Sequence, residues 1–358
     1  MKTNPNKDSF YTKLAFQQAE INLGSTSSNP SVGCIIVKNN SVISSGHTSL
    51  NGRPHAETNS LKKNLNYKNS NLYVTLEPCS HYGKTPPCVK KIISKKIKKV
   101  IFSINDIDVR SNGKAQKKLS RKKIKVKKFV LKKFAKNFYK SYFLQSSNQL
   151  PLVDAKLAIS KDFFTINKKK KWLTNIKSRN LGNFLRSKYD CLLTTSKTIN
   201  NDNPLLNCRL EGLEQKTPAL IILDRYFKIK KNVKIFNIKN RKIYIFISIN
   251  NNSKKKYFHK RGVKVIQVKE VENNLKTILF DIKKLGFNRV FVEAGGTFLN
   301  ELLKLKIIRN LYLFKSSKKI FSNGINNSSL LHIKKVKTTK LNEVKVNLDG
   351  DSLHKVEL

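Results

Sequence analysis

The segments HAE at residues 55–57 and PCSHYGKTPPC at residues 78–88 decide how the first half of this sequence is interpreted. His55, Cys79 and Cys88 offer one imidazole and two thiolates, a set that holds zinc and leaves the fourth position open. Catalytic zinc keeps such a position for water and lowers the pKa of that water to about 7. Glu57 is predicted to move the proton as general acid and base. The pattern predicts a nucleobase-type deaminase with one zinc per chain.

Two other interpretations of these residues stay open. A structural zinc needs a fourth protein ligand, and His81 is near enough in the sequence to be one. A degenerate scaffold that only binds metal would not need Glu57, so this carboxylate favours an enzyme. The five cysteines are an odd number in a chain with no recognisable secretion signal, which argues against a disulfide framework. Cys34 lies in an apolar stretch and is predicted to be a core residue.

Apolar periodicity around the two segments predicts a sheet covered by helices. Helical spacing occupies 8–23, 54–65 and 89–97, and strand-like runs occupy 32–37, 42–45, 72–76 and 99–104. Asn39-Asn40 is a plausible hairpin connection between the first two runs. A proline precedes both His55 and Cys79, which predicts that both ligands lie at helix starts, where backbone N–H groups favour a thiolate. The order of elements indicates an α/β domain.

A second β/α pattern follows a polar segment. Gln145–Gln149 precedes Pro151 and is the predicted linker, so we expect one domain at 1–146 and another at 150–358. No internal repeat relates the two. The predicted strands of the second domain are 153–159, 190–194, 219–223, 242–249, 263–268 and 289–292, and its predicted helices are 177–187, 275–285 and 298–305.

The formal charge of +51 admits two interpretations. A basic surface can concentrate a polyanion such as nucleic acid. Lysine and asparagine are, however, abundant from end to end, whereas a functional basic patch is concentrated on one face or in one tail. We therefore expect no nucleic-acid partner. The absence of a long apolar run or an apolar N-terminal segment predicts a soluble, cytoplasmic protein, for which a homo-oligomer is compatible with the sequence.

The spacing of the two cysteines carries a family resemblance. Eight residues separate them here, whereas the general nucleobase-deaminase signature has two. This longer form, with NPSVGC at 29–34, GH at 46–47 and GRPHAE at 52–57, resembles the bifunctional riboflavin biosynthesis (RibD) family, in which a pyrimidine deaminase is fused to a reductase.

The second half carries the same resemblance. KLAISKD at 156–162, WLT at 172–174, DNPL at 202–205 and VEAGGT at 292–297 match the reductase part of that family in order. A Gly-Gly turn between a strand and a helix also lets backbone N–H groups approach a phosphate. The turn lacks the spacing of a Rossmann fingerprint. This absence agrees with the dihydrofolate-reductase-like fold of the family's second domain.

The resemblance implies an α/β fold for both domains and two reactions. The first domain would be cytidine-deaminase-like with three layers, and would use Zn²⁺ to hydrolyse the 2-amino group of 2,5-diamino-6-(5-phosphoribosylamino)pyrimidin-4(3H)-one. The second would be dihydrofolate-reductase-like and would use NADPH to reduce the ribosyl side chain of 5-amino-6-(5-phosphoribosylamino)uracil to ribityl. The partner expected from both reactions is a phosphorylated pyrimidine.

The resemblance also implies roles for individual residues. It places Asn29, His47, His81 and Lys84 at the deaminase substrate, Ala158, Trp172, Thr198, Asp202, Gly295 and Gly296 at NADPH, and Arg186, Leu205, Arg209 and Glu293 at the reductase substrate. Arginine suits a phosphate because its planar fork donates two hydrogen bonds to an anion. The alternatives are a turn cap for Asn29, an exposed loop for His81 and Lys84, and a surface helix residue for Arg186.

Two residues and one segment depart from the family pattern, and a further residue lies at a variable position. Phe163 replaces the glycine that usually follows the aspartate of the KLAISKD segment, and Asp106–Val109 replaces an Asp-Pro-Asn-Pro loop. Lys170 stands where serine is usual, and Arg225 where serine or arginine occurs. We expect the deaminase to be intact and the reductase to be active. The rival hypothesis is a tRNA-type nucleic-acid deaminase whose basic second half binds RNA.

Overall fold

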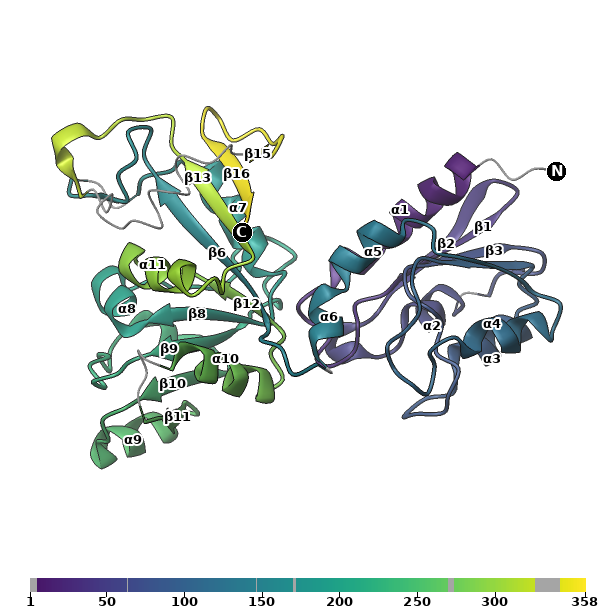
Figure 1. Cartoon of the computed structure of the whole chain (residues 1–358), viewed down its shortest axis with the longest axis horizontal. Coiled ribbons are helices and arrows are strands. Elements are labelled where there is room, and N and C mark those ends of the chain that lie inside the picture. The colour runs from purple at the N-terminus through teal and green to yellow at the C-terminus, as the bar shows by residue number, and fades with distance from the viewer. Residues whose placement is uncertain (1–4, 63, 146, 170–171, 270–273, 326–341) are drawn as a thin grey trace. The chain divides into compact units, whose positions relative to one another are not determined.

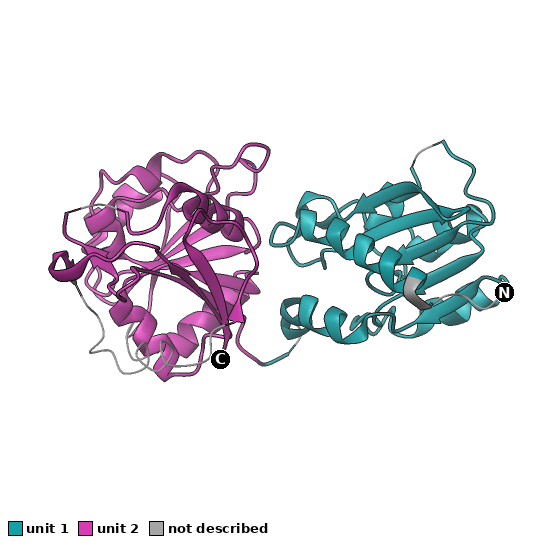
Figure 2. Cartoon of the chain, turned by 90° about the horizontal axis from the view of Figure 1, so that it is seen from above, with its two compact units in different colours: residues 1–148 teal, residues 149–358 magenta. Residues whose placement is uncertain are grey.

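The computed structural model describes residues 5–62, 64–145, 147–169, 172–269, 274–325 and 342–358, so that Lys170 lies outside the described residues. The chain divides into two compact units, residues 1–148 and 149–358 (Figures 1 and 2). Each unit has its own sheet and its own hydrophobic core. Within the described ranges, no helix is both long enough and apolar enough to span a bilayer.

Unit 1 is built on a five-stranded mixed sheet. Its strands, in order across the sheet, are β2 (Ser41–His47), β1 (Gly33–Lys38), β3 (Asn71–Val74), β4 (Lys99–Phe102) and β5 (Lys125–Lys128). β1 is antiparallel to β2 and β3, whereas β3, β4 and β5 are parallel. The predicted hairpin is confirmed, with Asn39 and Asn40 at φ 50° and 63°, the left-handed conformation that a tight hairpin turn requires. β5 was not predicted, because three of its four residues are lysines.

Helices cover both faces of this sheet (Figure 1). They are α1 (Pro5–Ile21), α2 (Ala56–Ser60), α3 (Cys88–Ser94), α4 (Lys114–Ser120), α5 (Lys132–Phe138) and α6 (Lys140–Gln145), with a 3₁₀ turn at Leu50–Gly52. Alternate residues of β1 point to opposite faces. Cys34 packs with Ala56 of α2, which confirms it as a core residue, and Ile35 packs with Tyr11 of α1. The helix predicted over 54–65 is shorter than expected and ends at Ser60.

A buried carboxylate fastens α1 to the sheet. Asp8 Oδ2 lies 2.6 Å from Lys127 Nζ on β5 and 3.2 Å from Lys99 Nζ on β4. Asp8 Oδ1 accepts a hydrogen bond of 2.9 Å from the Tyr73 hydroxyl on β3. Burial opposes ionisation of Asp8, but the hydrogen bonds from Lys127, Tyr73 and Lys99 prevail and lower its pKa.

Asp8→Asn is expected to reduce the free energy of unfolding of unit 1 by about 1.5–3 kcal/mol, the range for hydrogen bonds to a charged group. The folded-state pKa of Asp8 is depressed, so its contribution is present above the unfolded value near 3.8 and is lost as the pH falls through the lower folded value. Urea unfolding followed by circular dichroism at pH 7 and pH 3 measures both effects. As a control, Asp108→Asn removes a more exposed pair with Arg110 and should cost much less stability. Equal losses in the two variants would contradict the assignment.

Unit 2 is built on a nine-stranded sheet. Its strands, in order, are β11 (Lys264–Gln267), β10 (Ile243–Ile247), β9 (Ala219–Leu223), β8 (Cys191–Thr195), β12 (Arg289–Val292), β6 (Leu152–Ile159), β13 (Asn310–Lys315), β16 (Ser352–Glu357) and β15 (Asn342–Glu343). The first seven are parallel, and β16 is antiparallel to both β13 and β15. All six predicted strands are confirmed within three residues at each end.

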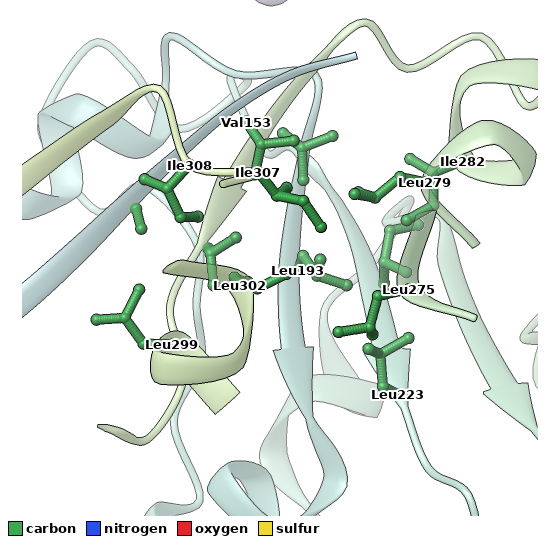
Figure 3. Close-up of a cluster of buried hydrophobic side chains, with 14 of the residues drawn as sticks. Val153, Leu193, Leu223, Leu275, Leu279, Ile282, Leu299, Leu302, Ile307 and Ile308 are labelled. Atoms are coloured by element: carbon green, nitrogen blue, oxygen red, sulfur yellow. The ribbon is translucent and has the colours of Figure 1, made fainter. Parts of the chain in front are cut away.

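The helices of unit 2 bury their apolar sides on this sheet. They are α7 (Ile176–Arg186), α8 (Ser196–Asp202), α9 (Asn252–His259), α10 (Leu275–Lys284) and α11 (Gly296–Lys304). Figure 3 shows Leu279 of α10 and Leu302 of α11 in the same cluster as Leu193 of β8. Phe258 of α9 belongs to a second cluster with Ile245 of β10. The smaller elements are β7 (Ile166–Asn167), which pairs with β14 (Gly324–Ile325), and 3₁₀ turns at Lys234–Asn237 and Phe321–Asn323.

The three predicted helices of unit 2 are confirmed, whereas α8, α9, β13 and β16 were missed. α9 reads NSKKKYFH and buries only Phe258, so its apolar stripe is too short to show a period. β16 reads SLHKVE, in which only Leu353 and Val356 are buried. Pairing with β13 therefore places β16 in the sheet.

Candidate active sites

Three ligand-type side chains of unit 1 converge on one point. His55 is the N-cap of α2, Cys88 is the first residue of α3, and Cys79 lies in the loop after β3. His55 Nδ1 is 3.6 Å from Cys79 Sγ and 3.5 Å from Cys88 Sγ. A tetrahedral zinc with bonds of about 2.3 Å to sulfur and 2.0–2.1 Å to nitrogen would hold those atoms about 3.6 Å apart. The donor set and its spacing therefore fit zinc.

The prediction that Cys79 begins a helix is wrong, because the chain from Cys79 to Pro87 is irregular. Cys88, which follows Pro87, begins the helix instead. The backbone N–H of Cys88 nevertheless donates to Cys79 Sγ at 3.3 Å, so that the start of α3 stabilises the Cys79 thiolate from outside its own segment. The Cys88 thiol and His55 also donate to Cys79, and the pKa of Cys79 falls to about 4.

Glu57 lies beside the three ligands in the first turn of α2. Its side chain is buried, and it interacts electrostatically with Cys79 and His55. Burial, followed by the negative charge of Cys79, raises the pKa of Glu57 to about 7. A carboxyl group with this pKa can both accept and return a proton at neutral pH.

Close packing fixes α2, and with it His55 and Glu57, against the sheet. A Cβ on Gly46 of β2 would lie 2.6 Å from the Ala56 carbonyl oxygen, so only glycine permits this approach. Asn59 Nδ2 donates to the His47 carbonyl at 2.7 Å, and Ser44 Oγ donates to the Ser60 carbonyl at 2.6 Å. Gly46 and His47 therefore help to hold the HAE segment in place against the sheet.

The predicted substrate residues of unit 1 lie on several loops and on the end of β2. Asn29 is half-buried, and its Nδ2 donates to the Gly52 carbonyl at 3.0 Å, which fastens the loop that leads to His55. His47 ends β2, and Lys84 is exposed in the loop between the cysteines. His81 Nδ1 lies 2.8 Å from Ser111 Oγ. Among the described residues, the group that could hold a metal contains His55, Cys79 and Cys88 without His81, which leaves the fourth position open.

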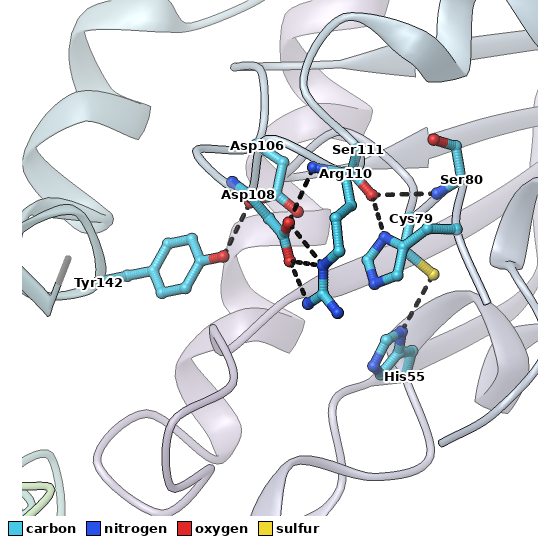
Figure 4. A network of polar contacts seen from close by, with 9 residues as sticks. His55, Cys79, Ser80, Asp106, Asp108, Arg110, Ser111 and Tyr142 are labelled. Atoms are coloured by element: carbon cyan, nitrogen blue, oxygen red, sulfur yellow. Dashed lines mark hydrogen bonds and ion pairs between the residues drawn. The ribbon is translucent and has the colours of Figure 1, made fainter. Parts of the chain in front are cut away.

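Glu77 orders the loop between β4 and α4 and was not predicted. Its buried carboxylate accepts backbone N–H bonds from Asp106 at 3.2 Å, Gly113 at 2.9 Å and Ala115 at 3.1 Å. Figure 4 shows the same loop, in which the Tyr142 hydroxyl donates to Asp106 and Asp108 pairs with Arg110. The sequence offered one signal for the role of Glu77, which is its position directly before Pro78-Cys79. The altered Asp106–Val109 segment thus forms an ordered loop.

Cys79→Ser is expected to abolish stoichiometric zinc binding, because a serine hydroxyl does not replace a thiolate of low pKa as a zinc ligand. Zinc per chain is measured by atomic emission on protein purified without chelator. The control is Cys34→Ser, which removes a buried thiol that lies outside the ligand group. This control should keep about one zinc per chain. Loss of zinc from both variants, or from neither, would contradict the ligand assignment.

A buried ion pair forms the centre of the candidate site in unit 2. Arg186, at the end of α7, lies with Nε 2.5 Å from Glu293 Oε1 and with Nη2 2.8 Å from Oε2. The two side chains are 13% and 10% exposed, which rules out the interpretation of Arg186 as a surface residue. Burial opposes ionisation of Glu293, but the charge and hydrogen bonds of Arg186 prevail and lower its pKa. Lys156 of β6 also contributes its charge to Glu293, and burial lowers the pKa of Lys156.

The guanidinium of Arg186 is hydrogen-bonded to protein groups. A phosphate was expected there because an arginine can donate two hydrogen bonds to an anion, but most of its donors are already used. Besides Glu293, its Nη1 donates to Asn183 Oδ1 at 2.7 Å and to the Asn207 carbonyl at 3.1 Å. Four bonds thus use most of its five N–H donors. Arg209 is exposed, and its Nη1 donates to Asn207 Oδ1 at 3.1 Å. Arg209 is therefore better placed than Arg186 to bind an anion.

The Gly295-Gly296 turn lies at the start of α11 and suits a ligand that approaches the backbone closely. Gly295 is the N-cap residue with φ −64°, a conformation open to any residue. A Cβ there would meet no protein atom within 4 Å. Neither backbone conformation nor internal packing therefore requires glycine, and the backbone at the helix start is open to the close approach of a ligand.

The other predicted cofactor residues come from three segments of unit 2, since Thr198 and Asp202 both lie in α8. Ala158 lies near the carboxyl end of β6, and Asp202 is the last residue of α8. Thr198 Oγ1 is 3.1 Å from the hydroxyl of Thr195, which is the N-cap residue of α8. Thr198 therefore also takes part in the capping contacts of this helix. Trp172 is 54% exposed, with the Arg179 guanidinium 4.9 Å from its ring centre.

Phe163 has a backbone conformation that favours glycine, the residue that the family resemblance implies at this position. Its φ is +68°, in the left-handed region that is costly for a bulky residue. Phe163 N–H donates to the Ser160 carbonyl at 3.0 Å, and the Asp162 carboxylate accepts from Phe321 N at 2.8 Å. The turn is therefore kept despite the substitution, and the Phe163 ring packs partly against the core.

Comparisons with known proteins cover nearly the whole chain. Residues 5–104 match the family described as cytidine and deoxycytidylate deaminase zinc-binding region, and residues 151–345 match the RibD C-terminal domain family. The riboflavin biosynthesis protein RibD of Aquifex aeolicus is 31% identical over 347 residues, which cover 94% of this chain and 96% of that protein. The RibD protein of Escherichia coli is 26% identical over 89% of this chain and 90% of its own length.

Solved structures give the same result. RibD of Acinetobacter baumannii (form 1) is 25% identical, with a TM-score of 0.82 over 99% of each chain. A Thermotoga maritima structure described as a diaminohydroxyphosphoribosylaminopyrimidine deaminase/5-amino-6-(5-phosphoribosylamino)uracil reductase is also 25% identical, with a TM-score of 0.82 over 99% of each chain.

Proposed function

This chain belongs to the RibD family, and from that premise we propose that residues 1–146 carry its deaminase and residues 150–358 its reductase. The chain is a bifunctional riboflavin biosynthesis enzyme, a zinc-dependent hydrolase fused to an NADPH-dependent reductase. The expected fold class is confirmed: a cytidine-deaminase-like unit is followed by a dihydrofolate-reductase-like unit. The rival RNA-binding hypothesis for the second half is not favoured, because that half matches a RibD domain.

The observation that carries the deaminase proposal is the convergence of His55, Cys79 and Cys88 beside the buried Glu57. Zinc, when bound by these three residues, supplies an activated water at neutral pH. Glu57 accepts the proton of that water and delivers it to the departing ammonia, a task for which its pKa of about 7 is suited. We assign Asn29, His47, His81 and Lys84 to binding of the phosphoribosyl diaminopyrimidine. Asn29 acts there partly by holding the loop before His55.

For the reductase we assign distinct tasks to the charged residues. Arg209 binds the ribose phosphate, Glu293 and Leu205 contact the sugar side of the substrate, and Arg186 holds Glu293 in place through its two bonds. NADPH, when bound along Ala158, Trp172, Thr198, Asp202 and the Gly295-Gly296 turn, supplies the hydride. Hydride transfer depends mainly on alignment of the cofactor and the sugar carbon, so we assign no obligatory acid.

The test is an assay of the full chain with the phosphoribosyl diaminopyrimidine, with and without NADPH. Ammonia release and NADPH oxidation are followed separately. Ammonia is expected in both conditions, and NADPH oxidation is expected only after deamination. Deamination without NADPH oxidation would contradict the reductase assignment and leave the deaminase standing. Titration with a tRNA in the same assay tests our expectation that the charge of +51 does not serve a nucleic-acid partner.

A further inference from the structure

Arg241 is a buried cation whose partners are all carbonyl oxygens. It lies just before β10 and is 8% exposed. Its Nε donates to the Pro218 carbonyl at 3.1 Å, Nη1 to the Leu205 carbonyl at 2.8 Å, and Nη2 to the Leu206 carbonyl at 2.5 Å. Within the described part of the chain, the guanidinium forms no ion pair. Burial of a charge without a counter-ion is costly, so these three contacts need an explanation.

The carbonyls that Arg241 holds belong to the loop between α8 and β9. Leu206 in this loop has φ +51°, a conformation that is unfavourable for leucine and persists only where the surroundings hold it. The next carbonyl, that of Asn207, accepts a bond from Arg186 at 3.1 Å. Three consecutive carbonyls are thus fastened to two arginines.

We propose that Arg241 is a positioning residue of the reductase, which holds the 205–209 loop in the conformation that binds the ribose phosphate. The proposal rests on the proposed function, in which Leu205 and Arg209 of this loop contact the substrate. Arg241 does not touch the substrate itself, because its donors point to the loop backbone. It acts by keeping the strained turn at Leu206 formed before substrate arrives, and so reduces the ordering cost of binding.

The first test is Arg241→Gln in the full chain. The KM for 5-amino-6-(5-phosphoribosylamino)uracil should rise about tenfold or more, as expected for loss of charge-assisted bonds. The KM for NADPH and the rate of ammonia release should stay at the wild-type values. Arg241→Lys, which keeps the charge but cannot reach three carbonyls, should recover part of the effect. For Arg241→Ala, added guanidinium at millimolar concentration should lower the raised KM.

The matched control is Arg289→Gln. Arg289 also donates from Nε to a backbone carbonyl, that of Lys188 at 3.0 Å, and lies 5.1 Å from the Tyr189 ring centre. It should lower stability and leave the KM for the phosphoribosylaminouracil unchanged. An unchanged KM in Arg241→Gln, or an equal rise in Arg289→Gln, would overturn the proposal.

A second measurement separates this inference from the proposed function. Trypsin cleavage after Arg209 reports the order of the loop without any turnover, and it should be faster in Arg241→Gln than in wild type or Arg289→Gln. If the wild-type chain reduces no substrate, the proposed reductase fails, while the cleavage rates still decide whether Arg241 orders the loop. Equal cleavage rates in all three proteins would contradict the role of Arg241.

Discussion

Glu57→Gln is expected to lower the rate of ammonia release by about 10²–10⁴-fold, the range attributed to a positioned general acid and base. Glutamine keeps the size of the side chain but cannot take the proton from water. Because Glu57 is not one of the three ligands, the variant should still contain about one zinc per chain. Ammonia release and zinc content measured on the same preparation check both parts.

The chain provides two controls for this experiment. The reductase serves as an internal control, since NADPH oxidation with pre-deaminated substrate should be unaffected by a change in unit 1. Glu20→Gln alters an exposed carboxylate of α1 and should leave ammonia release unchanged. Unchanged turnover in Glu57→Gln would remove Glu57 from the mechanism, and loss of zinc would show that it supports the metal instead.

Glu293→Gln should lower the free energy of unfolding of unit 2 by about 3–5 kcal/mol, because it leaves the buried Arg186 guanidinium without a counter-ion. Reductase activity should fall in parallel, while ammonia release should continue. The single tryptophan of the chain, Trp172, belongs to unit 2, so its fluorescence in urea reports the unfolding of that unit.

A double-mutant cycle identifies the pair as the cause. Arg186→Gln combined with Glu293→Gln removes both charges, and the double variant should cost less than the sum of the single variants. Asp281→Asn removes an ion pair with Lys284 in which the side chains are 79% (Lys284) and 31% (Asp281) exposed, and should cost less than about 1 kcal/mol. A loss in Glu293→Gln no larger than in Asp281→Asn would contradict the assigned pair.

The sequence predicted best the strands with a continuous apolar run. β9 reads ALIIL and is buried at every position, and its bounds were predicted to the residue. Two of the missed elements, α9 and β5, have a short apolar stripe and several lysines, whereas β13 was missed although its run NLYLFK is mostly apolar. These elements form because they pack on strands or helices far away in the sequence. The local spacing of apolar residues does not predict such contacts.

The same division holds for the sites. Chemical type and close spacing made His55, Cys79, Cys88 and Glu57 recognisable, because zinc chemistry restricts which residues can hold the metal and move the proton. Glu77 and Arg241 could not be assigned in this way. Their roles consist of bonds to backbone groups of distant loops, and any loop supplies such groups regardless of its side chains.

By itself, the sequence predicted the zinc ligands and the proton carrier, and it determined the order of the main strands along the chain. Only the tertiary structure decided that the start of α3 stabilises the thiolate of Cys79, and that Glu293 pairs with Arg186 through two hydrogen bonds. These last two residues are 107 positions apart, and their contact depends on how α7 packs beside β12. The sequence shows residue types and the local periodicity of helices and strands. The partner of a buried charge, in contrast, depends on which distant segments pack together.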